Sequence, residues 1–101
     1  MILDQLKEKY LEAQKRLMEK DQEHEAFSRK NSRYLEKVLN TQAWFEAYET
    51  FEEQSGYNEA EDAFIAAEVE LISVATGMTR DEVFRTPIKV REQLIAQLFQ
   101  K

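Results

Sequence analysis

The sequence predicts an all-α protein, and three observations indicate this fold class. The chain of 101 residues holds only two glycines and one proline, so few positions force a helix to end. Strong helix formers such as glutamate, glutamine, lysine, leucine and alanine dominate, whereas β-branched residues are sparse. No useful stretch alternates apolar and polar residues with the period of a strand. We therefore expect a single helical domain over residues 1–101, with a long N-terminal amphipathic, coiled-coil-like helix followed by a small bundle of shorter helices.

The N-terminal segment, residues 1–39, carries a heptad pattern. Its apolar seam consists of residues spaced three and four apart, namely Leu3, Leu6, Tyr10, Ala13 and Leu17. A straight helix over residues 2–39 would be roughly 57 Å long, whereas a compact domain of this size has a radius of gyration of about 13 Å. Two alternatives follow: the helix breaks within residues 21–32, or the protein self-associates through the seam. We favour self-association, with a homodimer as the simplest assembly.

The next segment, residues 42–99, is expected to form the helical bundle, with turns at 55–58, 77–79 and 86–87. Thr41 is suited to cap the first helix of this bundle. Within that helix, Trp44, Tyr48 and Phe51 fall on one side at helical spacing. These three aromatic residues are therefore core candidates.

The two glycines punctuate the middle of the chain. Gly56 suits the left-handed residue that follows a helix end. Asn58 followed by Glu61 resembles a capping box, with asparagine in the place of serine or threonine. The helix that these residues begin carries a clean apolar stripe and is expected to end at Gly77.

The last turns are predicted from a second capping box and from the proline. Thr79 and Glu82 have the spacing of a capping box at the start of a short helix. Pro87 disfavours helical geometry at Thr86 and so ends that helix. Thr86 can then cap a last helix, with Pro87 in its favoured first position. The glycine and proline near these turns thus have structural explanations.

Residues 70–86 resemble the turn of helix-turn-helix regulators. The resemblance rests on a small residue, a glycine, an apolar residue, a threonine and an apolar residue in the next helix: Ser73, Gly77, Met78, Thr79 and Val83. It implies a dimeric DNA-binding regulator. Residues 76–101 hold five Lys/Arg against three Asp/Glu, but the other 75 residues hold nine against seventeen. Because this balance opposes binding to a polyanion, nucleic acid is not the expected partner.

The last third of the chain is similar to small helical tail assembly chaperones of phages. The similarity rests on the order glycine–apolar–threonine, Asp-Glu, "TPI" and then "LIAQLF". It implies an assembly or chaperone-like factor that buries apolar helix faces in its partners. No functional residue is carried over from this resemblance.

Few residues are suited to catalysis or metal binding. The chain has no cysteine, and its single histidine, His24, lies where the heptad seam has loosened. Neither a Walker A motif nor a calcium-loop motif is present. We expect a protein that is not an enzyme and that needs no cofactor or metal. The absence of a long apolar run and of a secretory leader favours a cytoplasmic protein without a membrane span.

Charge segregation is the feature that most suggests a function. No Lys or Arg occurs between Lys37 and Arg80, a stretch of 42 residues that holds nine acids with aromatic residues among them. One interpretation is a solvated helix face beside a core stripe. The other is an acidic surface that docks a basic protein partner. Its candidate residues, within 46–62, are Glu46, Glu49, Glu52, Glu53, Glu59, Glu61 and Asp62. The second interpretation predicts a small acidic adaptor or inhibitor, of a kind that phages and mobile elements encode.

Overall fold

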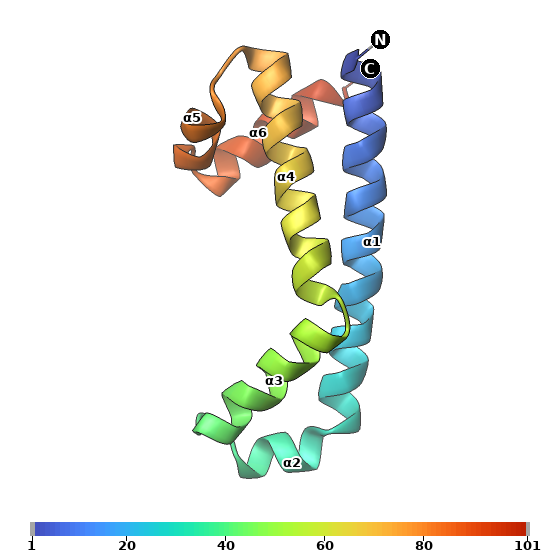
Figure 1. The fold of residues 1–101 in the computed structure, drawn as a ribbon, viewed down its shortest axis with the longest axis vertical. Helices are drawn as coiled ribbons and strands as arrows, with labels where there is room; N and C mark the ends of the chain where they lie inside the picture. The colour runs from blue at the N-terminus through green and yellow to red at the C-terminus, as the bar shows by residue number, and fades with distance from the viewer. Residues whose placement is uncertain (1, 101) are drawn as a thin grey trace. The chain divides into compact units, whose positions relative to one another are not determined.

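The computed structural model describes residues 2–100, and over this range it contains helices and no strand (Figure 1). The six helices in chain order are α1 (Ile2–Lys30), α2 (Ser32–Lys37), α3 (Gln42–Gln54), α4 (Tyr57–Thr76), α5 (Arg80–Arg85) and α6 (Ile88–Leu98). The all-α prediction is confirmed, as is the long N-terminal helix followed by shorter ones. No helix within residues 2–100 has both the length and the apolar character that a bilayer crossing requires.

The described residues divide into two compact units, although the sequence was interpreted as a single domain. Unit 1 comprises the chain up to Ala13 and again from Ala63 onward, whereas unit 2 comprises Gln14–Asp62. Helices α1 and α4 each contribute residues to both units. Each unit has its own packing.

The long N-terminal helix ends where an asparagine competes for a backbone carbonyl. Helix α1 continues to Lys30, and Asn31 leaves helical geometry with φ −107° and ψ 17°. The Asn31 side-chain Nδ2 donates a hydrogen bond to the carbonyl oxygen of Phe27 at 3.0 Å. Such local side-chain bonds offer the backbone an alternative to the helical ladder. The structure therefore has the break within 21–32 that was one of the two alternatives.

Three positions with positive φ set the turns around α3 and α4. Gly56 (φ 83°) adopts the left-handed conformation that the sequence predicted for it, and Gly77 (φ 79°), where α4 was expected to end, adopts it too. Asn40, with φ 61°, does the same before α3, as asparagine tolerates better than most residues. Thr41 is the N-cap of α3 by position, but its hydroxyl donates to the carbonyl of Val38 and makes no capping bond.

The capping predictions had mixed outcomes. The Thr79–Glu82 capping box is confirmed, because each side chain accepts from the backbone N–H of the other residue at 3.2 Å. The Asn58 box was wrong: α4 has already begun at Tyr57, whose N–H donates to the Ser55 hydroxyl. Thr86 does not cap α6 either. Its hydroxyl donates to the Glu82 carbonyl, and Pro87 is the N-cap.

Unit 1 holds a packed apolar core. The buried side chains that form it are Leu6, Tyr10, Ala67, Val69, Leu71, Ile72, Val83 and Ile95. Leu71, Ile72 and Val83 have no exposed surface. The Tyr10 ring packs against Phe64 and Phe99, with ring centroids 5.3 and 5.8 Å apart. Helices α1, α4, α5 and α6 all contribute, so this core ties together segments from both ends of the chain (Figure 1).

This packing places most of the predicted heptad seam against other helices of the same chain. Leu6 and Tyr10 are buried in the core of unit 1, and Leu3 and Ala13 are partly buried against it. Leu17 belongs to unit 2, where it is half-buried. The apolar positions of α1 in unit 1 are covered by α4 and α6 of the same chain. The predicted self-association through this seam, and the homodimer with it, stay predictions.

The described residues of unit 1 form two ion pairs. Arg91 Nε lies 3.5 Å from Glu68 Oε1, and these side chains are only 14% and 13% exposed. Burial raises the pKa of Glu68, and Glu92 raises it too, whereas the positive charge of Arg91 lowers it. Lys9 Nζ lies 3.3 Å from Glu70 Oε2 in a more exposed pair. Glu68 and Glu70 are the two acids of unit 1 that belong to the long stretch without Lys or Arg. Each is thus paired with a basic side chain of the same unit.

Unit 2 is packed mainly by aromatic rings that stay partly exposed. Its fully buried side chains among the described residues are Leu35 and Ala60, and α3 contains none. Phe27 of α1 stacks on Phe51 of α3 with ring centroids 4.3 Å apart. Lys20 Nζ donates to the carbonyl oxygen of Ser55 at 2.8 Å, where its charge suits the C-terminal end of α3.

Candidate protein-binding surface

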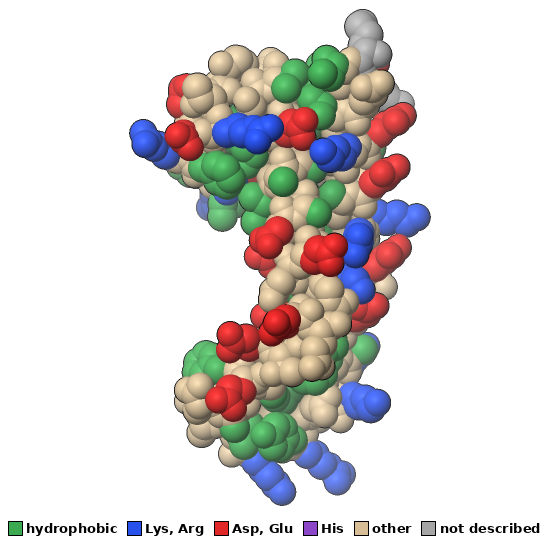
Figure 2. Space-filling view, viewed as in Figure 1, with side chains coloured by type: hydrophobic (Ala, Val, Ile, Leu, Met, Phe, Trp, Pro, Cys, Tyr) green, Lys and Arg blue, Asp and Glu red, His purple; other side chains and the backbone are tan. Residues whose placement is uncertain are grey.

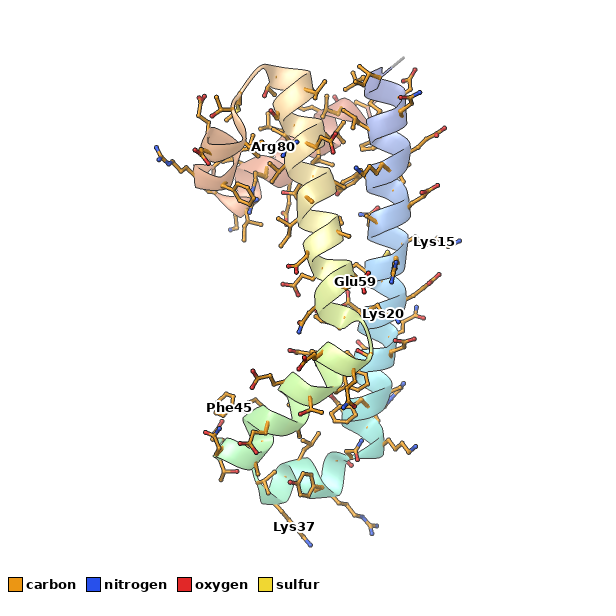
Figure 3. All side chains as sticks on the ribbon, viewed as in Figure 1. Lys15, Lys20, Lys37, Phe45, Glu59 and Arg80 are labelled. Atoms are coloured by element: carbon orange, nitrogen blue, oxygen red, sulfur yellow. The ribbon has the colours of Figure 1, made fainter. Side chains whose placement is uncertain are left out.

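The aromatic side of α3 is exposed to an unusual degree for core candidates. Trp44, Tyr48 and Phe51 do share one side of the helix, as their spacing predicted. Each is half-buried, and none reaches the burial of the unit 1 core. Phe45, on the neighbouring side, is 55% exposed, and Figure 3 shows its ring pointing away from the ribbon of α3. The aromatic stripe is therefore only partly used for packing inside the chain.

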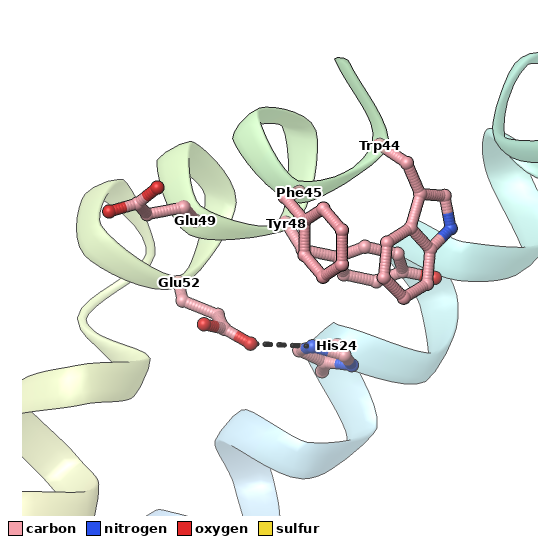
Figure 4. A pocket seen from close by; sticks show the side chains of 6 residues that line it. All are labelled: His24, Trp44, Phe45, Tyr48, Glu49 and Glu52. Carbon is pink, nitrogen blue, oxygen red and sulfur yellow. Dashed lines mark hydrogen bonds and ion pairs between the residues drawn. The ribbon is translucent and has the colours of Figure 1, made fainter. Parts of the chain in front are cut away.

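A groove lies where this stripe meets α1, and we refer to it as the aromatic groove. It has a volume of about 550 Å³ and is lined by His24 of α1 and by residues of α3, namely Trp44, Phe45, Tyr48, Glu49 and Glu52 (Figure 4). All of these residues belong to unit 2. Trp44 packs its ring edge-on against Phe45 and Tyr48, with centroids 4.8 and 5.1 Å apart. The groove thus combines aromatic walls with two carboxylates and has no Lys or Arg among its lining residues.

Contacts with α1 position the walls of the aromatic groove. The His24 ring stacks on Tyr48, with centroids 5.2 Å apart and an interplanar angle of 21°. His24 Nε2 lies 3.2 Å from Glu52 Oε1, the contact that Figure 4 marks with a dashed line. At the end of the same ring, the Tyr48 hydroxyl lies 2.9 Å from Ser28 Oγ, within hydrogen-bond distance. His24 and Ser28 are four residues apart on α1, so one face of that helix contacts both the ring and the hydroxyl of Tyr48.

The predicted acidic residues all lie in unit 2, and we call them the acidic surface. Six are exposed, namely Glu46, Glu49, Glu53, Glu59, Glu61 and Asp62, whereas Glu52 is half-buried against His24. Within residues 2–100, no ion pair joins any of the seven to a Lys or Arg. Figure 2 shows acidic side chains over α3 and the start of α4. The acids that the sequence singled out are therefore presented to solvent, apart from Glu52.

The geometry of α3 aligns part of the acidic surface with the aromatic groove. Glu46, Glu49 and Glu53 are spaced three and four residues apart, so they follow one side of the helix. Glu49 belongs both to this row and to the lining of the groove. The open aromatic walls and the row of carboxylates are thus adjacent features of one helix.

The electrostatic environment of unit 2 is negative near the start of α4. Burial raises the pKa of Tyr57, and the carboxylates of Asp21, Glu61 and Glu52 raise it further. These acids come from three helices, α1, α3 and α4. Unit 2 as a whole holds seven Lys/Arg and twelve Asp/Glu, a balance of −5. A positively charged group is therefore attracted to this unit.

A second hollow flanks α3 on its other side. It has a volume of about 450 Å³, and its lining includes Phe27, Tyr34, Glu46 and Phe51, all of unit 2. Tyr34 is 51% exposed. The aromatic side chains of α1, α2 and α3 thus leave two open hollows against the same helix, of which the aromatic groove carries both Glu49 and Glu52.

The two segments that resemble known families, residues 70–86 and the last third of the chain, include α5 and α6. Helix α5, in the place of a recognition helix, has six residues and a length of roughly 9 Å. Asp81 and Glu82 are exposed at its start. Phe84 of α5 and Ile88 of α6 are 57% and 64% exposed, which leaves apolar surface on this part of unit 1.

The structure also locates the single histidine, which the sequence had placed on a loosened seam. His24 instead packs among the aromatic rings of unit 2 and contacts Glu52. Its spacing of three residues from Phe27 on α1 was the available signal, because both then face the aromatic stripe of α3. Within residues 2–100, no group of three or more His, Asp or Glu side chains has an arrangement that could hold a metal ion.

Comparison with protein-family models, with curated proteins and with solved structures found no match to this chain.

Proposed function

We propose that this protein is a non-enzymatic adaptor or inhibitor that binds a basic protein partner through the acidic surface of unit 2. The observation that supports the proposal is the exposure of most of the seven acids and their lack of Lys or Arg partners within the described residues. Six are exposed, and within residues 2–100 none of the seven is paired with a Lys or Arg of the chain. By contrast, Glu68 and Glu70 of unit 1 are paired with Arg91 and Lys9.

The charge of this surface has a kinetic consequence. Exposed like charges in one region steer an oppositely charged partner, which raises the association rate at low salt. The same acids form no i,i+4 ion pair within α3, because that helix holds no Lys or Arg, although Glu46 Oε1 accepts a hydrogen bond from Gln42 Nε2 at 3.2 Å. The exposed acids of α3, Glu46, Glu49 and Glu53, form no ion pair within residues 2–100 and are therefore available for intermolecular contacts.

The proposal is tested by a paired capture experiment from lysate. One variant replaces Glu53, Glu59 and Glu61 with Gln and Asp62 with Asn, which leaves the aromatic groove intact. The matched control makes the same change of charge on exposed acids of unit 1, with Asp4→Asn, Glu8→Gln, Glu12→Gln and Glu92→Gln. Circular dichroism checks that both variants keep the helical fold.

The expected result is a set of basic proteins that the wild-type chain and the control variant retain and the unit 2 variant loses. This set should elute between low and moderate salt, because ion pairing at a surface is screened. Equal loss with both variants would show that only net charge matters. Retention by the unit 2 variant would refute the acidic surface as the docking site.

A second candidate function is an assembly or chaperone-like factor, and the exposed apolar side chains of α5 and α6 favour it. Phe84 and Ile88 lie in the segment that is similar to phage tail assembly chaperones. Binding of this kind should persist at high salt and be lost in a Phe84→Ser, Ile88→Ser variant. Salt-sensitive binding that this variant leaves unchanged would reject it.

A further inference from the structure

The aromatic groove gives the acidic surface a specific anchor point. Trp44 lies within contact distance of both Tyr48 and Phe45, and all three rings line the groove. Tryptophan and tyrosine at the centre of a contact region are typical of binding hot spots. Because none of these rings is fully buried in the chain, part of their surface is available to a partner.

Two carboxylates give this aromatic surface a preference for cations. Glu49 and Glu52 line the same groove, three residues apart on α3. Glu52 places Oε1 within 3.2 Å of His24 Nε2, and no hydrogen bond within residues 2–100 engages its Oε2. Glu49 is exposed and makes no ion pair with another described residue. Both side chains therefore have acceptor oxygens for a donor that enters the groove.

We infer that the aromatic groove binds an arginine side chain of the basic partner, stacked on Trp44 or Tyr48 and donating hydrogen bonds to Glu49 or Glu52. A guanidinium group is planar, stacks on aromatic faces and presents a fork of N–H donors to a carboxylate. A lysine ammonium group is a more strongly hydrated point charge, which fits the rings less well. The inference rests on the proposed function and adds to it the residue type that the partner contributes.

The single tryptophan makes the groove directly observable. Trp44 is the only tryptophan of the chain, so its fluorescence reports on the groove alone. The probes are blocked peptides of one Gly/Ser-rich sequence whose basic positions hold arginine, lysine or citrulline. Citrulline keeps the planar shape of arginine without its charge. Titration of each peptide at low salt, with parallel calorimetry for variants, measures affinity and contact with Trp44 together.

We expect the arginine peptide to change Trp44 emission and to bind about tenfold more tightly than the lysine peptide, and the citrulline peptide to bind more weakly than either. Glu49→Gln should weaken the arginine peptide several-fold more than its matched control, Glu53→Gln. Glu53 is exposed on the same helix and has the same charge, but it does not line the groove. Phe45→Ala, at a largely exposed ring, should also weaken binding without loss of helical structure.

The outcomes separate this inference from the proposed function. Equal binding of the arginine and lysine peptides, with unchanged Trp44 emission and equal effects of the two glutamate variants, would overturn the arginine site and leave the acidic surface in place. Tight binding of the citrulline peptide would overturn the requirement for charge at the groove. Failure of both basic peptides to bind at low salt would contradict the proposed function as well.

Discussion

The ion pair between Glu68 and Arg91 allows a sharp test of the packing in unit 1. We expect Arg91→Met to destabilise the protein at neutral pH, because it leaves the Glu68 carboxylate, only 13% exposed, without its cation. The second variant adds Glu68→Gln to Arg91→Met. This double variant removes the negative charge of residue 68 and keeps the shape of its side chain. Glu68→Gln alone is the third variant of the cycle.

The magnitude follows from the geometry of the pair. At 3.5 Å and an effective dielectric constant of about 20, the attraction is about 5 kcal/mol, and the desolvation of the two groups offsets most of it. Arg91 Nε also lacks a hydrogen-bond partner among the described residues. Glu68→Gln alone leaves the Arg91 guanidinium, only 14% exposed, without its anion, so we expect it to lower the free energy of unfolding by about 2 kcal/mol. Arg91→Met alone should cost about 2–3 kcal/mol, at the low end for a broken buried pair because both groups keep some exposure.

The pH dependence has a definite sign. The pKa of Glu68 is already raised by burial, and the loss of Arg91 removes the one contribution that lowers it. A group whose pKa is higher in the folded state contributes stability that is present below its unfolded pKa and lost as the pH rises through the folded pKa. Below the ordinary glutamate pKa of 4.5, the cost of Arg91→Met should therefore shrink, measured against the Glu68→Gln, Arg91→Met double variant.

Urea unfolding followed by far-ultraviolet circular dichroism measures these differences at pH 7 and at pH 4. The double variant should recover most of the stability that Arg91→Met loses at pH 7. Two results would point instead to lost packing of the arginine stem. One is that Arg91→Met lowers the free energy of unfolding equally at both pH values, and the other is that adding Glu68→Gln restores none of it. That outcome would refute the electrostatic reasoning.

Three further outcomes are expected in the two units. Leu71→Ala, at a side chain with no exposed surface, should cost about 2–5 kcal/mol in urea unfolding, whereas a loss below about 1 kcal/mol would contradict the burial of this residue. Thr79→Ala should cost about 1 kcal/mol, because it removes the hydroxyl that accepts from the Glu82 N–H, and Thr79→Ser, which keeps the hydroxyl, is the control. In hydrogen exchange, amides of α3 should exchange faster than those of the unit 1 part of α4, since unit 2 fully buries only Leu35 and Ala60 among its described residues. Equal protection would show that the aromatic packing of unit 2 is as stable as the core of unit 1.

Much of the fold could be predicted because local signals decide it. The Thr79–Glu82 box, the positive φ of Gly56 and the end of α4 at Gly77 depend on a few neighbouring residues, and all were predicted. Helix starts that depend on competing hydrogen bonds were not. The Thr86 hydroxyl donates to the Glu82 carbonyl at 2.8 Å and does not cap α6.

The partner of the heptad seam could not be predicted from the pattern. An apolar stripe requires cover, but the spacing of Leu6 and Tyr10 is the same whether the cover comes from a second chain or from α4 and α6. The choice depends on contacts between residues far apart in the sequence, such as Tyr10 with Phe64 and Phe99. These contacts become visible only in three dimensions.

The candidate site was predicted in part. The acidic surface follows from composition alone, since a stretch without Lys or Arg has no local partner for its acids. The aromatic groove needed the structure, because it depends on the approach of His24 on α1 to Tyr48 and Glu52 on α3. The degree of burial of Trp44 could not be predicted from helical spacing, which gives the side of a helix but not what covers it.

The absence of Lys and Arg between Lys37 and Arg80 determines which chemical reagents can report on a bound partner. Helices α3 and α4 contain no lysine for amine-reactive cross-linkers and no cleavage site for trypsin. Neither lysine cross-linking nor limited trypsin digestion would therefore detect a partner bound to these helices. Carbodiimide coupling joins a carboxylate directly to an amine of a neighbouring protein. It would therefore label a complex at Glu49 or Glu53 while a peptide fragment of residues 38–80 stays intact for mass spectrometry.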